Sequence, residues 1–184
     1  MAAPTARDRL VSTADRLFYQ HGLRAVGVDR VIAEAGVAKA TLYAHFPTKD
    51  DLILAALEHR EAAVDAYFNE ATARLGGGLT GFFSALGEWF RTPGFRGCAF
   101  QNALAELADP DHPAADYVRG MKGRFHACIA ALVGQAVGPA GAPAVPAVAL
   151  LVEGAIQVAT ITGDPGAADV ARGAAEKLVA ALKG

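Results

Sequence analysis

The sequence has little of what marks several large classes of protein. It holds two cysteines in 184 residues, too few for a disulfide scaffold. Nothing in it resembles a secretory signal, and its start, MAAPTARDRL, is polar. No alternating run of polar and apolar residues flanked by hairpin turns predicts a β-strand. These absences favour an all-α protein, which we expect in the cytoplasm.

An excess of charge of one sign is also missing, since the formal net charge is -2 and charged residues make up 20% of the chain. The charge is divided unevenly. Residues 1–50 carry seven Lys or Arg and five Asp or Glu, whereas residues 51–184 carry ten and fourteen. A mildly basic head on an acidic body permits contact with a polyanion without establishing it.

One long stretch, residues 125–152, contains no Asp, Glu, Lys or Arg, and therefore raises the question of a membrane span. A spanning helix needs about 20 continuous apolar residues. The segment GPAGAPAVP at 138–146 interrupts the stretch with three prolines, which stop a helix. We therefore expect two buried helices joined by a loop, and no membrane partner.

Arrangements that would support catalysis or metal binding are missing as well. We find no Ser/His/Asp or Cys/His arrangement in a convincing context, no phosphate-binding loop and no metal-ligand spacing. Asp109, Asp111 and His112 are clustered, but Asp-Pro and His-Pro steps are ordinary turn chemistry. The sequence thus predicts no catalytic residues, no cofactor and no metal. A helical enzyme whose pocket performs chemistry is the alternative.

What the sequence does have is helical periodicity along almost its whole length. Thr5 can cap a first helix in a capping box with Asp8, and Gly22 can end that helix. Short helices are expected at 28–35 and 38–46, and Thr48 can cap a fourth that runs to about residue 75. The later helices are expected at 79–92, 98–108, 113–137, 146–162 and 165–183, which makes about nine in all.

The short helices at 28–35 and 38–46, joined by a glycine-containing turn, predict a helix-turn-helix, whose second helix enters the major groove of DNA. Leu42 and Phe46 face one way and can hold this helix against the first two. The opposite arc carries groups that suit phosphate oxygens and base edges. The alternative is a helical corner with a solvated polar face. The candidate DNA contacts, including one at the start of the fourth helix, are Lys39, Ala40, Thr41, Tyr43, His45 and Lys49.

The run AGVAKATLYAHFPTKDDL at 35–52 resembles the DNA-binding domain of the TetR family of transcriptional repressors, and the resemblance extends from about residue 6 to residue 57. The family's typical run is Ala-Gly-Val-Ser-Lys-Gly-Thr-Leu-Tyr-x-His-Phe, followed by Lys and Leu. Gly27, Ala38 and Ala40 depart from it. Ala38 lacks the hydroxyl of a serine cap, a contact worth about 1 kcal/mol. These departures affect the operator sequence rather than the fold.

The resemblance implies a DNA-binding domain at 1–47 and a ligand-binding and dimerisation domain at 48–184. It implies a homodimeric repressor that binds a palindromic operator of double-stranded DNA and is released by a small, mostly apolar effector. The last two helices would form the dimer, because their Ala, Val and Leu faces are overly apolar for a monomer. They can also complete a monomer core. A ligand-independent or activating regulator is the functional alternative.

A ligand pocket in the body is implied by the same resemblance. A stripe of aromatic residues at helical spacing could line the pocket, although such stripes more often belong to the core. Polar residues among apolar ones can pair with a ligand. Cys98 is a candidate for thiol-based sensing, and the alternative is that it is a buried apolar cysteine. Cys128 is expected in the core. The candidate ligand contacts are Phe83, Leu86, Trp89, Phe90, Cys98, Asn102, Glu106, Tyr117, Met121, Phe125 and Gln157.

Overall fold

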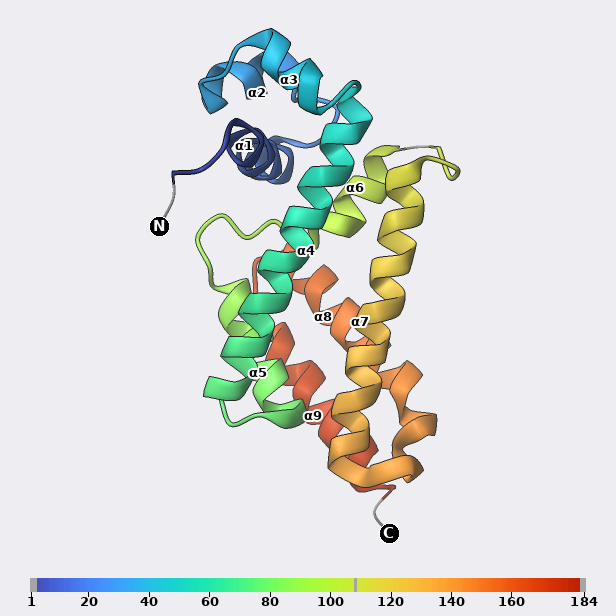
Figure 1. Cartoon of the computed structure of the whole chain (residues 1–184). Helices are drawn as coiled ribbons and strands as arrows, with labels where there is room; N and C mark the ends of the chain where they lie inside the picture. The colour runs from blue at the N-terminus through green and yellow to red at the C-terminus, as the bar shows by residue number, and fades with distance from the viewer. Residues whose placement is uncertain (1–2, 108, 183–184) are drawn as a thin grey trace. The chain divides into compact units, whose positions relative to one another are not determined.

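The computed structural model of the chain describes residues 3–107 and 109–182. Within these residues the chain forms nine α-helices, one 3-10 helix and no strand, which confirms the all-α prediction. The predicted helix ends at residues 108 and 183 lie outside the described residues. The elements, shown in Figure 1, are α1 (Ala6–His21), α2 (Val28–Ala35), α3 (Lys39–His45), α4 (Lys49–Arg74), α5 (Gly78–Phe90), α6 (Ala99–Leu107), α7 (Pro113–Val137), η1 (Gly138–Ala144), α8 (Val145–Thr162) and α9 (Ala167–Ala180).

The ends of the first helices follow from local side-chain chemistry. The capping box at the start of α1 forms as expected, with the Asp8 N–H donating to Thr5 Oγ1 at 3.2 Å and the Thr5 N–H donating to Asp8 Oδ2 at 3.0 Å. Gly22 ends α1 with a positive φ of 90°. At the start of α4, the Asp51 N–H donates to Thr48 Oγ1 at 3.1 Å in the same arrangement. The sequence thus specifies where both helices begin.

The chain divides into two compact units. The first unit comprises Met1–Ala63 and Ala99–Gly120, and so contains α1, α2, α3, the first part of α4, α6 and the start of α7. The second unit comprises Val64–Cys98 and Met121–Gly184, with α5, η1, α8, α9 and the remainders of α4 and α7. The predicted domain boundary at 47/48 lies between α3 and α4 and stays a prediction. By its contacts, α6 groups with the N-terminal helices.

In the first unit, α3 is anchored by its apolar side. Leu42 is completely buried and Phe46 is 3% exposed, as the spacing predicted. The Arg7 guanidinium lies 5.5 Å from the centre of the Phe46 ring and covers it. Truncating a leucine buried in this way costs about 2–5 kcal/mol. The apolar side of α3 therefore fixes the helix and leaves its polar side to face outwards.

In the second unit, aromatic rings pack against one another. Phe68 stacks on Phe82 with ring centres 5.2 Å apart, and Trp89 meets Phe95 edge to face at 4.9 Å. Helices α4 and α5 also approach each other closely near the turn that joins them, since a Cβ added at Gly81 would lie 2.6 Å from the Thr72 carbonyl oxygen. These contacts make most of the aromatic stripe a packed core.

The apolar stretch that raised the membrane question lies in α7, η1 and α8. Its most apolar 18-residue window has a mean hydropathy of 1.8, and 39% of that window is buried. The expected loop at 138–146 is wrong in part, because Gly138–Ala144 form the 3-10 helix η1 and α8 already begins at Val145. Proline can occupy the first turn of a helix, where its missing N–H leaves no bond unmade. The break between two helices is confirmed.

Candidate DNA-binding surface and body pocket

The polar side of α3 is open to solvent. The Lys39 side chain is 62% exposed, Tyr43 is 44% exposed, and Ala40 and His45 are exposed, while Thr41 is half-buried. Neither α2 nor α3 has a side-chain cap, at Gly27 and Ala38 respectively, as the sequence predicted. Their first N–H groups therefore remain available to an anion. The arrangement offers donors to a polyanion along one side of α3.

Asp29 on α2 holds Lys39 on this surface. The Lys39 Nζ donates to Asp29 Oδ1 at 3.0 Å, and both side chains are mostly exposed. This hydrogen bond, and then the charge of Asp29, raise the pKa of Lys39, so the ammonium stays charged. A DNA phosphate or base edge must therefore replace Asp29 as the partner of Lys39. This pair could not be expected from the sequence, because the two residues lie on different helices.

Lys49 differs from the other predicted DNA contacts. It is half-buried, its Nζ donates to the Leu23 carbonyl oxygen at 2.6 Å, and it lies 6.0 Å from the centre of the Phe18 ring. Contact between Lys49 and a phosphate would require this internal bond to break. The phosphate contact of Lys49 stays a prediction, and the bond to Leu23 argues against it.

Ion pairs tie α2 to α1. Glu34 accepts from Arg16 at 2.7 Å and from Arg30 at 2.9 Å, and these hydrogen bonds, that of Arg16 first, lower the pKa of Glu34. The Arg9 Nε also donates to the carbonyl oxygen of Ala35 at 3.2 Å. Only the pair of Arg30 and Glu34, four residues apart on one helix, could be expected from the sequence. Together the contacts hold α2 against α1.

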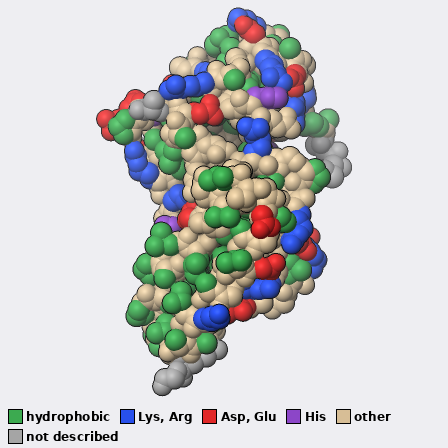
Figure 2. Space-filling model, turned by 180° about the vertical axis from the view of Figure 1, so that it is seen from behind, with side chains coloured by type: hydrophobic (Ala, Val, Ile, Leu, Met, Phe, Trp, Pro, Cys, Tyr) green, Lys and Arg blue, Asp and Glu red, His purple; other side chains and the backbone are tan. Residues whose placement is uncertain are grey.

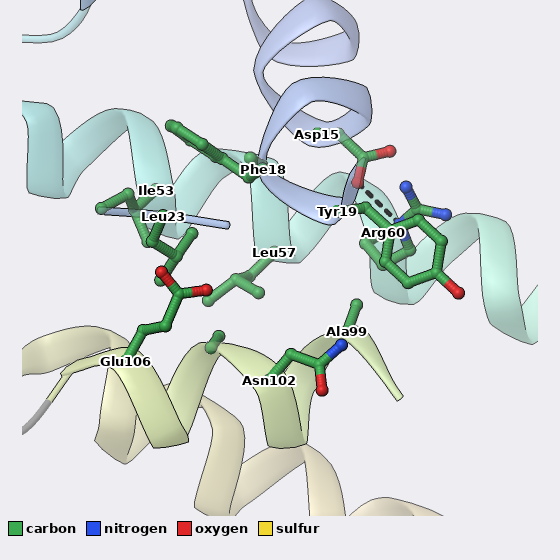
Figure 3. Close-up of a pocket in the computed structure, with 12 residues that line it drawn as sticks. Asp15, Phe18, Tyr19, Leu23, Ile53, Leu57, Arg60, Ala99, Asn102 and Glu106 are labelled. Atoms are coloured by element: carbon green, nitrogen blue, oxygen red, sulfur yellow. Dashed lines mark hydrogen bonds and ion pairs between the residues drawn. The ribbon is translucent and has the colours of Figure 1, made fainter. Parts of the chain in front are cut away.

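A small cavity lies among α1, α4 and α6 in the first unit, and Figure 3 shows its lining. Asp15 accepts from Arg60 at 2.6 Å, and the Arg60 guanidinium lies 4.7 Å from the centre of the Tyr19 ring. The cavity measures about 30 Å³. Ligand pockets of about 300–1,000 Å³ are usual, so this one has room for water rather than for an effector. Of the candidate ligand contacts, Asn102 and Glu106 line it.

The candidate ligand contacts divide between the two units. Asn102, Glu106 and Tyr117 belong to the first, where Tyr117 donates to Glu61 and Glu106 accepts from the Arg24 N–H. Asn102 and Gln157 are exposed rather than enclosed among apolar groups. The members in the second unit are buried or half-buried apart from Gln157, and they are Phe83, Leu86, Trp89, Phe90, Cys98, Met121, Phe125 and Gln157.

The two cysteines have opposite surroundings. Cys98 is buried just before α6, so its place at a helix start is confirmed. Cys128 was expected in the core, and this is wrong, because it is exposed on α7. Partial shielding, and then the charge of Asp65, raise the pKa of the Cys128 thiol. Apolar neighbours in the sequence misled the prediction, since α7 turns this position outwards.

In the second unit, α8 and α9 pack against each other, and their exposed faces form an apolar surface. Leu150 and Ile161 on α8 are 72% and 73% exposed, and Val170 on α9 is 76% exposed. Val158 and Leu178 extend the same two helix faces. Figure 2, which views the side on which α8 and α9 lie, shows hydrophobic side chains gathered on it. Exposed large side chains of this kind typically mark an interface.

Comparison with known proteins identifies the fold and the family. Residues 10–56 match the profile of bacterial regulatory proteins, tetR family. Among curated proteins, an uncharacterised HTH-type transcriptional regulator of Bacillus subtilis, YerO, is 34% identical over 53 residues, and the transcriptional activator FasR of Mycolicibacterium smegmatis is 40% identical over 52 residues. These matches span 29% and 28% of this chain, but only 18% and 24% of the lengths of the two relatives.

A solved structure extends the similarity to nearly the whole chain. SCO4454, a TetR-family transcriptional regulator from Streptomyces coelicolor, is 34% identical and superposes with a TM-score of 0.86. The alignment covers 97% of this chain and 96% of that one. Because both units are matched at this identity, and because α3 presents its polar side to solvent, the chain belongs to the TetR family and is a DNA-binding transcriptional regulator rather than an enzyme.

Proposed function

We propose that the protein is a repressor that binds a palindromic operator as a homodimer and is released from it by a small, mostly apolar effector. The observation that carries the proposal is the exposed polar side of α3, held in place by the buried Leu42 and Phe46. We expect Lys39, Ala40 and Thr41 to meet base edges, and Tyr43 and His45 to donate to phosphates. Such a protein acts where the DNA is, in the cytoplasm.

The apolar surface of α8 and α9 supports the homodimer. A second copy would cover Leu150, Ile161 and Val170 by packing the same two helices against these. A two-fold pair of such faces is self-complementary and closes without leaving a further apolar surface. Two α3 helices related by the same axis would then meet successive major grooves of a palindromic site.

The second unit is the proposed place of the effector. Its aromatic and aliphatic side chains, among them Phe83, Trp89 and Phe125, favour an apolar ligand. The ion pair between Lys122 and Glu153, at 2.7 Å, supplies polar groups beside Phe125, which lies 5.3 Å from the Lys122 Nζ. An effector would lower the affinity for DNA only as far as it binds the non-binding arrangement more tightly.

Replacement of Tyr43 by phenylalanine tests the DNA-binding side. The change keeps the ring and removes only the hydroxyl that we expect to donate to a phosphate. The affinity for a duplex selected from a random pool should fall by about fivefold, and equally for selected and unrelated sequences, because a phosphate contact carries no sequence information. Fluorescence anisotropy measures both. A loss confined to the selected sequence would contradict the phosphate assignment of Tyr43.

An activator is the second candidate, favoured by the similarity of 52 residues of this chain to FasR, which is described as a transcriptional activator. In vitro transcription from a promoter that carries the selected duplex distinguishes the two. A repressor reduces the transcript and the effector restores it, whereas an activator raises the transcript.

A further inference from the structure

A single peptide group in the turn between α1 and α2 is held at both ends by charged side chains. The Leu23 carbonyl oxygen accepts from Lys49 Nζ at 2.6 Å, and the Arg24 N–H donates to Glu106 Oε2 at 2.9 Å. Leu23 O and Arg24 N belong to the same peptide unit. An ammonium from α4 and a carboxylate from α6 therefore bind opposite ends of one dipole, and all four residues lie in the first unit.

The two bonds reinforce each other. Hydrogen bonds to charged groups are roughly twice as strong as those between neutral groups. Each bond also polarises the peptide group and strengthens the other. Lys49 and Glu106 are both half-buried, so solvent and salt screen them less than they screen a surface pair. We call this arrangement of Lys49, the Leu23–Arg24 peptide group and Glu106 the peptide clamp.

Gly22 makes room for the clamp. A Cβ added at Gly22 would lie 2.8 Å from Glu106 Oε1, and the residue has a φ of +90°. The carboxylate also lies at the C-terminal end of α1, where the partial negative charge of a helix disfavours an anion. The Arg24 N–H offsets this cost. Figure 3 shows Glu106 reaching from α6 towards Leu23.

We propose that Glu106 and Lys49 are positioning residues for DNA binding. Through the peptide clamp they fix the α1–α2 turn, and with it α2 and α3, to α6 and to the start of α4. Glu106 lies far outside residues 10–56, which match the family profile. The proposal rests on DNA binding through α3. Loss of the clamp reduces the fraction of molecules with a correctly placed α3, and the apparent affinity falls by that fraction.

Two substitutions of Glu106 test the proposal with a matched control. Glu106→Ala removes the acceptor, and Glu106→Asp keeps the charge but shortens the side chain by one methylene. The control is Glu58→Ala, which removes an exposed carboxylate from α4 in the same unit. The probe is the duplex that the wild-type protein selects from a random pool, and circular dichroism checks that each variant is folded.

Both Glu106 variants should bind this duplex about tenfold more weakly, which corresponds to about 1.4 kcal/mol. A loss of affinity in Glu106→Ala would be decisive, because removal of a negative charge would by itself strengthen binding to DNA. The control Glu58→Ala should therefore bind as well as the wild type or slightly better. An affinity of both Glu106 variants equal to or above that of the wild type overturns the proposal.

Lys49→Met tests the other arm, since methionine keeps an apolar stem without the donor. Binding should weaken while its salt dependence stays unchanged, whereas loss of a phosphate contact would reduce the salt slope by about 1. The double variant with Glu106→Ala should lose less than the sum of the single losses, because both act on one peptide group. A reduced salt slope would assign Lys49 to phosphate and remove it from the clamp.

Amide hydrogen exchange of Arg24, followed by NMR without DNA, tests the clamp separately. Exchange should be faster in both Glu106 variants, relative to amides of α8 in the same sample. If the wild type selects no duplex, the proposed function fails, while the exchange rates still judge the clamp. Unchanged exchange at Arg24 overturns the clamp. Faster exchange together with unchanged affinity for DNA overturns its positioning role.

Discussion

Truncation of Ile161 to alanine is expected to weaken the proposed homodimer without destabilising the single chain. Ile161 is 73% exposed on α8, so it contributes little to the folding of one protomer. Full burial of such a side chain contributes about 1.5–3 kcal/mol, and covering the exposed part contributes about 1–2 kcal/mol. A two-fold dimer contains the substitution twice, so the loss is about 2–4 kcal/mol. The dissociation constant of the dimer should rise by about 30- to 1,000-fold.

Sedimentation velocity over a range of protein concentrations measures this constant. Leu178→Ala is the graded control, because Leu178 is only 41% exposed and loses correspondingly less on truncation. The thermal unfolding midpoint of the dissociated protomer should be unchanged in Ile161→Ala, whereas Leu178→Ala should lower it, because more of the Leu178 side chain is buried within one protomer. The reasoning is refuted if Ile161→Ala dimerises like the wild type, or if Leu178→Ala costs more than Ile161→Ala.

Two further predictions concern charged groups of the first unit. Asp29→Asn should tighten binding to DNA of any sequence by about threefold in low salt, because it removes a negative charge beside Lys39; weaker binding in a fluorescence assay would mean that Asp29 instead places Lys39 for contact. The bonds to Thr48 lower the pKa of Asp51 from 3.8, so its contribution is complete above pH 3.8 and is lost as the pH falls towards the lower pKa of the folded state. Asp51→Asn should therefore be less stable than the wild type to urea at pH 7, and the difference should shrink below pH 3.8; a difference that grows in acid would contradict this sign.

Local chemistry made the fold and α3 predictable from the sequence. Thr5, Gly22 and Thr48 mark helix ends through contacts within a few residues, and the structure places the ends there. The spacing of Leu42 and Phe46 likewise fixed which side of α3 is buried. Signals of this kind depend on near neighbours in the chain, which a sequence displays directly.

Contacts between distant segments could not be predicted in this way. Glu106 was expected to meet a ligand, yet its carboxylate bonds to the Arg24 N–H, 82 residues away in the chain. Lys49 was expected to face phosphate, yet it bonds to Leu23. In both cases the partner is a backbone group. Because almost every residue carries the same backbone groups, the residue pattern does not indicate which of them will be the partner. Cys128 was misplaced because its apolar neighbours do not show which side of the long α7 faces outwards.

Selection of bound duplexes from a random DNA pool tests the central claim most directly, namely that the polar side of α3 reads DNA. The wild-type protein should enrich a palindromic sequence, and Lys39→Ala and Thr41→Ala should enrich sequences altered at the base pairs that these side chains meet. Enrichment of no sequence by the wild type, or of one and the same sequence by the wild type and both variants, would contradict the account.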